Sequence, residues 1–245
     1  GEIILGTDSH TCTHGALGAF ATGIGNTDAA FALGTGKTWL KIPETIKFII
    51  NGTLPSHMMA KDLILHMIGM IGFDGATYCA MEFEGEVIDA LSIEERMTIC
   101  NMVIEAGGKN GVIAADAKTE AYVKERTDVA YEIFKSDADA NYKDVHVFDV
   151  TDMEPVVAAP SAPDKRRPVS QLADTQLTRA YIGSCTGGKI NDFEAAALVL
   201  KGHKVSIDTF IVPSTTFVET QMNERTIDGV TYMQIFKDAG CRIGP

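Results

Sequence analysis

A run of seven residues near the start of the chain, Asp8–His14, places chemically active side chains unusually close together. It holds a carboxylate, three hydroxyls, a thiol and two imidazoles, and it follows the apolar, strand-like residues 2–5. The end of a strand is a common position for an active site in α/β proteins. The run therefore predicts a site, with a capped turn carrying one exposed histidine as the simpler alternative. A zinc site built from His10, Cys12 and His14 is a third hypothesis, because the histidines stand four residues apart with the thiol between them.

A second candidate is Cys185, which lies in the glycine-containing turn 183–188 directly after the strand-like residues 180–182. Backbone amides in such a turn stabilise a thiolate, the form of cysteine that binds metals or attacks substrates. A nucleophilic cysteine of the papain type would also need a histidine base, and the sequence selects none. A metal ligand and a structural cysteine are the two interpretations that remain.

Two polar residues, Asn101 and Glu105, lie on a helix whose start is marked by Ser92 and Glu95. Serine and glutamate three residues apart fit a capping box, in which each side chain accepts from the backbone of the other. Residues four apart share one face of a helix, and an apolar stripe runs beside this pair. The spacing predicts that both polar side chains point toward the interior.

The segment Gly34-Thr35-Gly36-Lys37-Thr38 is a weaker candidate, similar to the end of a phosphate-binding loop. That loop needs a further glycine at the position of Phe31. Tight backbone packing is therefore favoured over nucleotide binding.

Ordinary α/β elements surround these candidates. Residues 46–50 predict a strand that ends at the turn signal Asn51-Gly52. A helix is expected to begin at Ser56, with an apolar stripe of residues three to four apart that faces the core. The stripe consists of Met59, Leu63, Met67 and Met70.

Four prolines between residues 152 and 168 predict a linker with little regular structure. Residues 1–151 before this linker form one expected α/β region, and residues 169–245 after it begin a further α/β domain. The latter contains a strand, a helix and a strand, which predict a βαβ unit with a right-handed crossover. These three elements are expected at residues 180–182, 193–200 and 204–212.

Composition limits the classes of partner. The formal net charge is −12, and the longest basic run is Lys165-Arg166-Arg167, which argues against a nucleic-acid-binding face. The longest apolar stretch, Leu63–Ile71, is too short to span a membrane and is interrupted by a histidine and a glycine. Five irregularly spaced cysteines do not fit a secreted disulfide framework, so a reducing cytoplasm is the expected location.

Five sequence blocks together resemble the aconitase superfamily, and within it the large subunits of the isopropylmalate dehydratase and homoaconitase branch. The blocks occur in the family's order and cover almost the whole chain. They are GTDSHTCTHG at 6–15, AFATGIG at 19–25, DGATY at 74–78 with AMEF at 80–83, NMVIEAGGKN at 101–110, and IGSCT at 182–186. The resemblance implies three-layer α/β domains, with residues 1–151 covering the end of the first subdomain and the second, and residues 169–245 starting the third.

The resemblance also implies the site. Cys185 matches the first of three cysteines that hold a 4Fe-4S cluster, one iron of which is left open for substrate. The other two cysteines form a Cys-x-x-Cys that is expected beyond Pro245, and Cys241 stands too early to be either. A segment upstream of residue 1, with an aspartate-histidine pair implicated as acid, is expected as well. The chain alone is therefore expected to be inactive.

Further matches assign the polar residues. His10 and Glu105 match a histidine-carboxylate pair beside the open iron, and Asn101 matches the neighbouring amide. Asp8 matches a carboxylate that pairs with an upstream histidine, and Ser9 matches a substrate-contacting position. Loss of water from a hydroxy acid needs a Lewis acid for the departing hydroxide and a base for the carbon proton, which fits these residue types. In the family that base is a serine of a separate swivelling domain or small subunit.

Two residues differ from patterns in the family and bear on which of its branches the chain resembles. Thr13 stands where aconitase proper has asparagine, which favours the branch that isomerises 2- and 3-isopropylmalate in leucine biosynthesis. Gly187 stands where relatives often have asparagine, which leaves homoaconitate and 2,3-dimethylmalate open as substrates. A cluster-free, non-catalytic fragment or regulatory relative is the alternative from another class.

Overall fold

The computed structural model describes residues 2–244. The chain divides into two compact units, Gly1–Leu172 and Ala173–Pro245. Each unit combines helices with a parallel sheet, so the α/β fold class expected from the sequence is confirmed.

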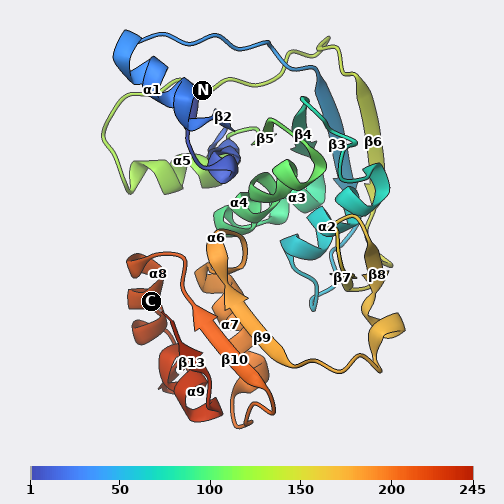
Figure 1. Cartoon of the computed structure of the whole chain (residues 1–245), viewed down its shortest axis with the longest axis vertical. Coiled ribbons are helices and arrows are strands. Elements are labelled where there is room, and N and C mark those ends of the chain that lie inside the picture. Colours follow the sequence, from blue (N-terminus) through green and yellow to red (C-terminus); the bar gives the residue numbers. More distant parts are fainter. Residues whose placement is uncertain (1, 245) are drawn as a thin grey trace. The chain divides into compact units, whose positions relative to one another are not determined.

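A four-stranded sheet forms the frame of the first unit, and all its neighbouring strands are parallel (Figure 1). Its strands, in spatial order, are β5 (Asn110–Ile113), β4 (Ala80–Glu84), β3 (Thr45–Asn51) and β6 (Asp144–Asp149). Side chains alternate between the two faces of a strand, and on β3 Ile46, Phe48 and Ile50 are all buried on the same face. These side chains form the floor of the main hydrophobic core.

Helices cover that face and complete the core. The helices between β3 and β6 are α2 (Ala60–Ile71), α3 (Glu86–Ala90), α4 (Ile93–Asn101), the 3-10 helix η2 (Met102–Ala106) and α5 (Ala117–Lys124). Buried residues of α2, α4 and η2 belong to the same core as β3. The capping box at the start of α4 is present, because Glu95 N donates to Ser92 Oγ and Ser92 N donates to the Glu95 carboxylate.

The N-terminal segment forms its own small substructure. It consists of β1 (Ile3–Gly6), the 3-10 helix η1 (Ser9–Leu17), β2 (Phe20–Gly23) and α1 (Asn26–Thr35). Strands β1 and β2 pair in parallel, and η1 forms the connection between them. Ala21 N donates to the side chain of Asn110 on β5, which ties this substructure to the main sheet.

The start of α2 and its stripe differ from the expectation. Ser56 lies in a turn, and Met59 is the residue that precedes the helix. Met59 can occupy this position because the carboxylate of Asp62, in the first turn, accepts a hydrogen bond from the backbone amide of Met59. Leu63 and Met67 are buried as expected, whereas Met70 is 53% exposed, since α2 ends one residue later and its last turn extends beyond the core.

Residues 152–168, expected to be a linker, contain regular structure. Strands β7 (Val156–Ala158) and β8 (Arg166–Pro168) pair in an antiparallel hairpin, and η3 (Val169–Leu172) follows. Val156 is part of the main core, and its amide donates to Asp62 of α2. Apolar contact and one side-chain acceptor therefore hold a proline-rich segment against the helix.

The contact between this hairpin and α2 predicts a pH-dependent stability. The guanidinium of Arg166 bonds to Nδ1 of His66, and burial together with the positive charge of Arg166 lowers the pKa of His66 from 6.5. The unfolded chain therefore binds this proton more readily than the folded one, so stability is full above about pH 6.5 and falls as the pH drops below it. His66→Gln removes this dependence, so the difference in free energy of unfolding between wild type and variant should change by at most about 1.4 kcal/mol per pH unit. Urea unfolding from pH 7.5 to 5 checks this, and parallel pH profiles for the two proteins would contradict it.

The second unit has a three-stranded parallel sheet in the order β13, β10, β9. Its elements are β9 (Arg179–Gly183), α6 (Ser184–Gly187), α7 (Ile190–Leu200), β10 (Asp208–Val212), α8 (Thr216–Glu224), β11 (Thr226–Ile227), β12 (Val230–Thr231), α9 (Tyr232–Ala239) and β13 (Arg242–Ile243). Phe193, Met222 and Phe236, from three different helices, pack with Ile211 of β10 in a second core. The predicted strand-helix-strand unit is thus formed by β9, α7 and β10.

Candidate active site

Helix η1 positions the first group of candidate residues. Asp8 caps this helix, because its carboxylate accepts a 2.7 Å hydrogen bond from His10 N. The backbone carbonyl of Asp8 also accepts a 2.6 Å hydrogen bond from the Thr11 hydroxyl. The cap places Ser9 and His10 in the first turn, where their side chains are close together.

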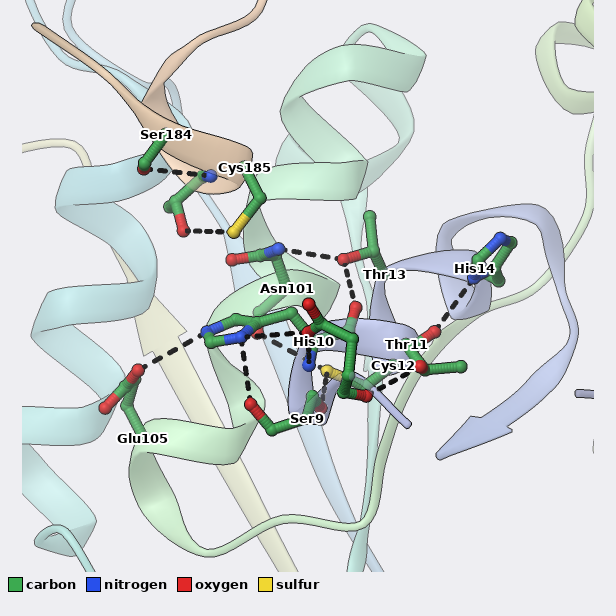
Figure 2. A network of polar contacts seen from close by, with 12 residues as sticks. Ser9, His10, Thr11, Cys12, Thr13, His14, Asn101, Glu105, Ser184 and Cys185 are labelled. Atoms are coloured by element: carbon green, nitrogen blue, oxygen red, sulfur yellow. Dashed lines mark hydrogen bonds and ion pairs between the residues drawn. The ribbon is translucent and has the colours of Figure 1, made fainter. Parts of the chain in front are cut away.

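The imidazole of His10 lies between several oxygen atoms (Figure 2). Its Nε2 is 3.5 Å from Oε1 of Glu105. Its Nδ1 is 3.1 Å from the hydroxyl oxygen of Ser9 and 3.5 Å from Oδ1 of Asp8. Both ring nitrogens therefore face an oxygen, and the ring is about one quarter exposed at 27%. An imidazole held in this way can keep a proton on either nitrogen and exchange it with a group in the adjacent solvent-accessible space.

Asn101 completes this group through the backbone of η1. Its amide nitrogen donates to the Thr13 hydroxyl at 2.8 Å, and that hydroxyl donates to the carbonyl of His10 at 2.7 Å. Cys12, fully buried, contacts the carbonyls of Ser9 and Asn101 through its thiol. The structure thus brings Asp8, Ser9, His10, Asn101 and Glu105 together within the first unit.

The close approach of η1 to β5 depends on glycine. A Cβ atom on Gly15 would lie 1.5 Å from the carbonyl oxygen of Gly111, an impossible distance. A Cβ on Gly111 would lie 2.7 Å from a methyl group of Val103. Gly15 therefore lets the helix that carries His10 pack directly against β5, and Gly111 lets β5 lie close to η2.

Asn101 and Glu105 differ in burial because the helix changes its winding between them. Asn101 ends α4 and is 1% exposed, and Glu105 lies in η2, where the chain tightens to a 3-10 helix. Glu105 is partly exposed and faces His10 from there. The prediction of two inward-pointing side chains is therefore right for Asn101 and only partly right for Glu105.

The zinc hypothesis finds no support in this geometry. The rings of His10 and His14 are directed away from each other in Figure 2, and His14 Nδ1 lies 2.9 Å from the carbonyl of Thr11. Burial also raises the pKa of Cys100, close to Cys12, so this interior disfavours thiolates. Across residues 2–244, no three side chains of histidine, cysteine, aspartate or glutamate converge on a metal-sized site.

The phosphate-loop alternative is excluded by position. Gly36 ends α1 in a left-handed conformation, with its amide bonded to the carbonyl of Ala32. A phosphate-binding loop must instead precede a helix, whose N-terminal amides point at the phosphate. The glycine run therefore terminates a helix.

Cys185 belongs to the second unit and lies at its sheet edge, in the single turn of α6 that follows β9. Gly183 before it is required, because a Cβ there would lie 2.3 Å from the carbonyl oxygen of Val212. Of the five cysteines, Cys185 is the exposed one, while three are buried and Cys241 is half-buried. An exposed thiol on a tight turn is a suitable donor for a metal centre completed by other ligands.

The sequence did not predict a role in these sites for two contributors. Thr13 links Asn101 to the backbone of His10, and buried Lys189 donates to the carbonyls of Cys185 and Thr186. The only available signal for Lys189 is its position directly after the cysteine turn, and a lysine there is normally read as a surface residue.

Comparison with known proteins gives the family. The sequence model of the aconitase family (aconitate hydratase) matches residues 1–177 and 170–244. The chain belongs to the aconitase family.

Curated relatives refine the position of this aconitase-family chain. It is 54% identical to the chloroplastic 3-isopropylmalate dehydratase large subunit of Arabidopsis thaliana, over 98% of the chain and 48% of that protein. It is 50% identical to the 3-isopropylmalate dehydratase large subunit of Heliobacterium modesticaldum, over 99% of the chain and 57% of that protein. It is 49% identical to the 3-isopropylmalate dehydratase large subunit 1 of Pyrococcus abyssi, over 100% of the chain and 58% of that protein. The chain spans about half the length of the curated relatives it matches.

No helix within residues 2–244 of this aconitase-family chain has the length and apolar character needed to cross a bilayer.

Proposed function

We propose that this chain is part of a hydro-lyase that interconverts 2-isopropylmalate and 3-isopropylmalate by dehydration and rehydration, the isomerisation step of leucine biosynthesis. The observation that carries the proposal is His10, bracketed by Glu105, Ser9 and Asp8, in a chain about half identical to large subunits of that dehydratase. The pair His10 and Glu105 comes from segments far apart in sequence, so their contact reflects a site built by the fold.

Each polar residue has a task in this chemistry. His10, oriented by the carboxylate of Glu105, protonates the departing hydroxyl oxygen of the substrate and recovers the proton from water. Ser9 donates a hydrogen bond to a substrate carboxylate, and Asp8 holds the turn that presents both residues. Asn101, fixed by Thr13, supports the wall beside His10. We expect the base that removes the carbon proton to lie outside these residues.

The cofactor we propose is a 4Fe-4S cluster with Cys185 as one ligand. The fit rests on the exposed thiol of Cys185 at a strand end, on a turn of small residues, while no complete ligand group exists among residues 2–244. We propose that two further cysteines outside residues 2–244 complete the ligand set. When bound, such a cluster supplies a Lewis acid that weakens the carbon-oxygen bond of the hydroxyl group.

The proposed partner is a small subunit that carries the swivelling domain and the base. Support comes from the relatives, which are described as large subunits. We also propose a reducing compartment, the cytoplasm, because the five irregularly spaced cysteines do not fit a secreted disulfide framework.

The test is turnover by the protein as its gene encodes it, purified without oxygen and combined with the small subunit of its source. We expect 3-isopropylmalate to be dehydrated, which is measured by the absorbance of the unsaturated product, and iron and sulfide to be present. Homoaconitate and 2,3-dimethylmalate serve as competing substrates, since the side-chain pocket decides between them. If one of these competitors were turned over and 3-isopropylmalate were not, that competitor would replace 3-isopropylmalate as the proposed substrate. Absence of both iron and turnover would favour a cluster-free regulatory relative.

A further inference from the structure

The ammonium group of Lys189 lies under the turn that carries Cys185. Lys189 is only 7% exposed, and its Nζ donates to the carbonyl of Cys185 at 3.0 Å and to that of Thr186 at 2.6 Å. A buried ammonium is costly unless hydrogen bonds replace its hydration. The two carbonyls provide this replacement, so the contact is a built feature of the turn.

The same two carbonyls belong to the short helix α6 (Ser184–Gly187), and Lys189 donates to both of them from one side chain. Holding the peptide planes on the C-terminal side of Cys185 restricts the direction of its Cα–Cβ bond, from which the thiol projects.

The surrounding backbone packs closely against the turn. A Cβ on Gly188 would lie 2.4 Å from the carbonyl oxygen of Ser184, and Ser214 N donates to the carbonyl of Gly188 at 3.0 Å. The backbone of Lys189 is held as well, because its amide donates to Asp192 of α7 at 2.9 Å. Lys189 thus connects a rigid helix start to the turn of Cys185.

We propose that Lys189 is a positioning residue for the cluster ligand Cys185, an inference that rests on the proposed function. Lys189 acts in two ways without touching the sulfur. It holds the turn in the conformation that presents the thiol, and it places a fixed positive charge beside the residue that would bind an anionic cluster. A positive charge near a cluster favours its reduced form and raises its reduction potential.

The experiment compares Lys189→Gln, Lys189→Met and Lys189→Arg in the protein as its gene encodes it. After anaerobic reconstitution, we expect Gln and Met to release iron to a ferrous chelator about 10- to 100-fold faster, the usual range for loss of a residue that supports a metal ligand. The midpoint potential of the cluster should shift downward in both. Lys189→Arg, which keeps the charge and the donors, should return the rate of iron release and the midpoint potential toward wild type. Lys201→Gln is the matched control at the other end of α7, where Lys201 pairs with Asp228, and it should change neither value.

A second measurement does not require the cluster. Hydrogen exchange followed by mass spectrometry should show faster exchange over residues 183–189 in Lys189→Gln without iron, while exchange in β10 and α9 stays as in wild type. Wild-type exchange of the turn together with wild-type iron release would overturn the inference. If the wild-type protein itself takes up no iron, the proposed function fails, and the exchange comparison still decides whether Lys189 orders the turn.

Discussion

Replacing His10 by glutamine should lower kcat for the proposed dehydration of 3-isopropylmalate by about 10²- to 10⁴-fold, the range that one proton-transferring side chain contributes. Glutamine has similar reach and can hydrogen bond to Glu105, but it cannot carry a proton between substrate and water. The rest of η1 remains in place, because its cap depends on Asp8 and the backbone amide of residue 10, which the substitution retains. The measurement is steady-state turnover of the protein combined with its small subunit, at matched iron content.

His14→Gln is the control for this experiment. It changes the same residue type in the same helix, and the ring of His14 lies against the carbonyl of Thr11, directed away from His10 (Figure 2). Turnover should equal that of wild type. If His10→Gln turned over substrate as fast as His14→Gln, with the far-ultraviolet spectrum unchanged in both, His10 would have no part in proton transfer.

The local part of this site could be predicted from the sequence, since its signals are local. The carboxylate, hydroxyls and imidazole of residues 8–10 are consecutive, and a cap at Asp8 needs only short-range contacts. Strand β3 was predictable for a similar reason, because residues 46–50 end at the local turn signal Asn51-Gly52. The capping box of α4 likewise depends on two residues three positions apart.

The pairing of His10 with Glu105 could not be derived from spacing. It depends on η1 packing against β5 through Gly15 and Gly111, and a glycine in a sequence does not state which backbone it will approach. The resemblance to known families proposed the pair, and the structure gives its geometry. The change from α to 3-10 winding after Asn101 was also hidden, since both helices contain the same residue types.

Errors arose where tertiary contacts override local signals. Ser56 is a better helix cap by type than Met59, yet the helix begins where Asp62 can accept from the backbone. Buried cations were not predicted, because lysine and arginine are normally exposed. Lys189 is one such residue, and Arg96 is another.

Arg96 is fully buried between α4 and α5, and its partner is Asp116. Nη2 of the arginine donates to the carboxylate of Asp116 at 2.6 Å and to the carbonyl of Asp89 at 3.2 Å. The Arg96 guanidinium holds the pKa of Asp116 well below its ordinary value of 3.8, and hydrogen bonds from Thr119 act in the same direction. The pair connects α4, which ends at Asn101, to the cap of α5.

Asp116→Asn should lower the free energy of unfolding by about 3 kcal/mol. Removing one partner of a buried ion pair typically costs about 3–5 kcal/mol, and the lower end applies because the Asp116 side chain is 35% exposed and solvent screens part of the attraction. Asparagine is an equally good helix cap, so the bond from Thr119 N to the side chain can persist and the loss reports the charge on Asp116. Glu120→Gln, on the same helix, removes an exposed pair with Lys124 and should cost less than about 0.5 kcal/mol.

The difference in free energy of unfolding between wild type and Asp116→Asn should depend on pH, which checks independently that it comes from the charge on Asp116. Because the pKa of Asp116 is depressed in the folded state, the unfolded chain binds the proton first, and the stabilisation is full above about pH 3.8 and is lost as the pH falls below that value. The free energies of unfolding of wild type and Asp116→Asn, measured with urea, should therefore differ by the full amount at pH 5 to 7. They should converge as the solution is acidified below pH 4. A difference that stayed constant down to pH 2.5 would show that the substitution acts through packing or capping. In that case α4 would be held in place by its apolar contacts with α2, and the buried charge of Arg96 would be satisfied by the carbonyl of Asp89 and the hydroxyl of Thr119 alone.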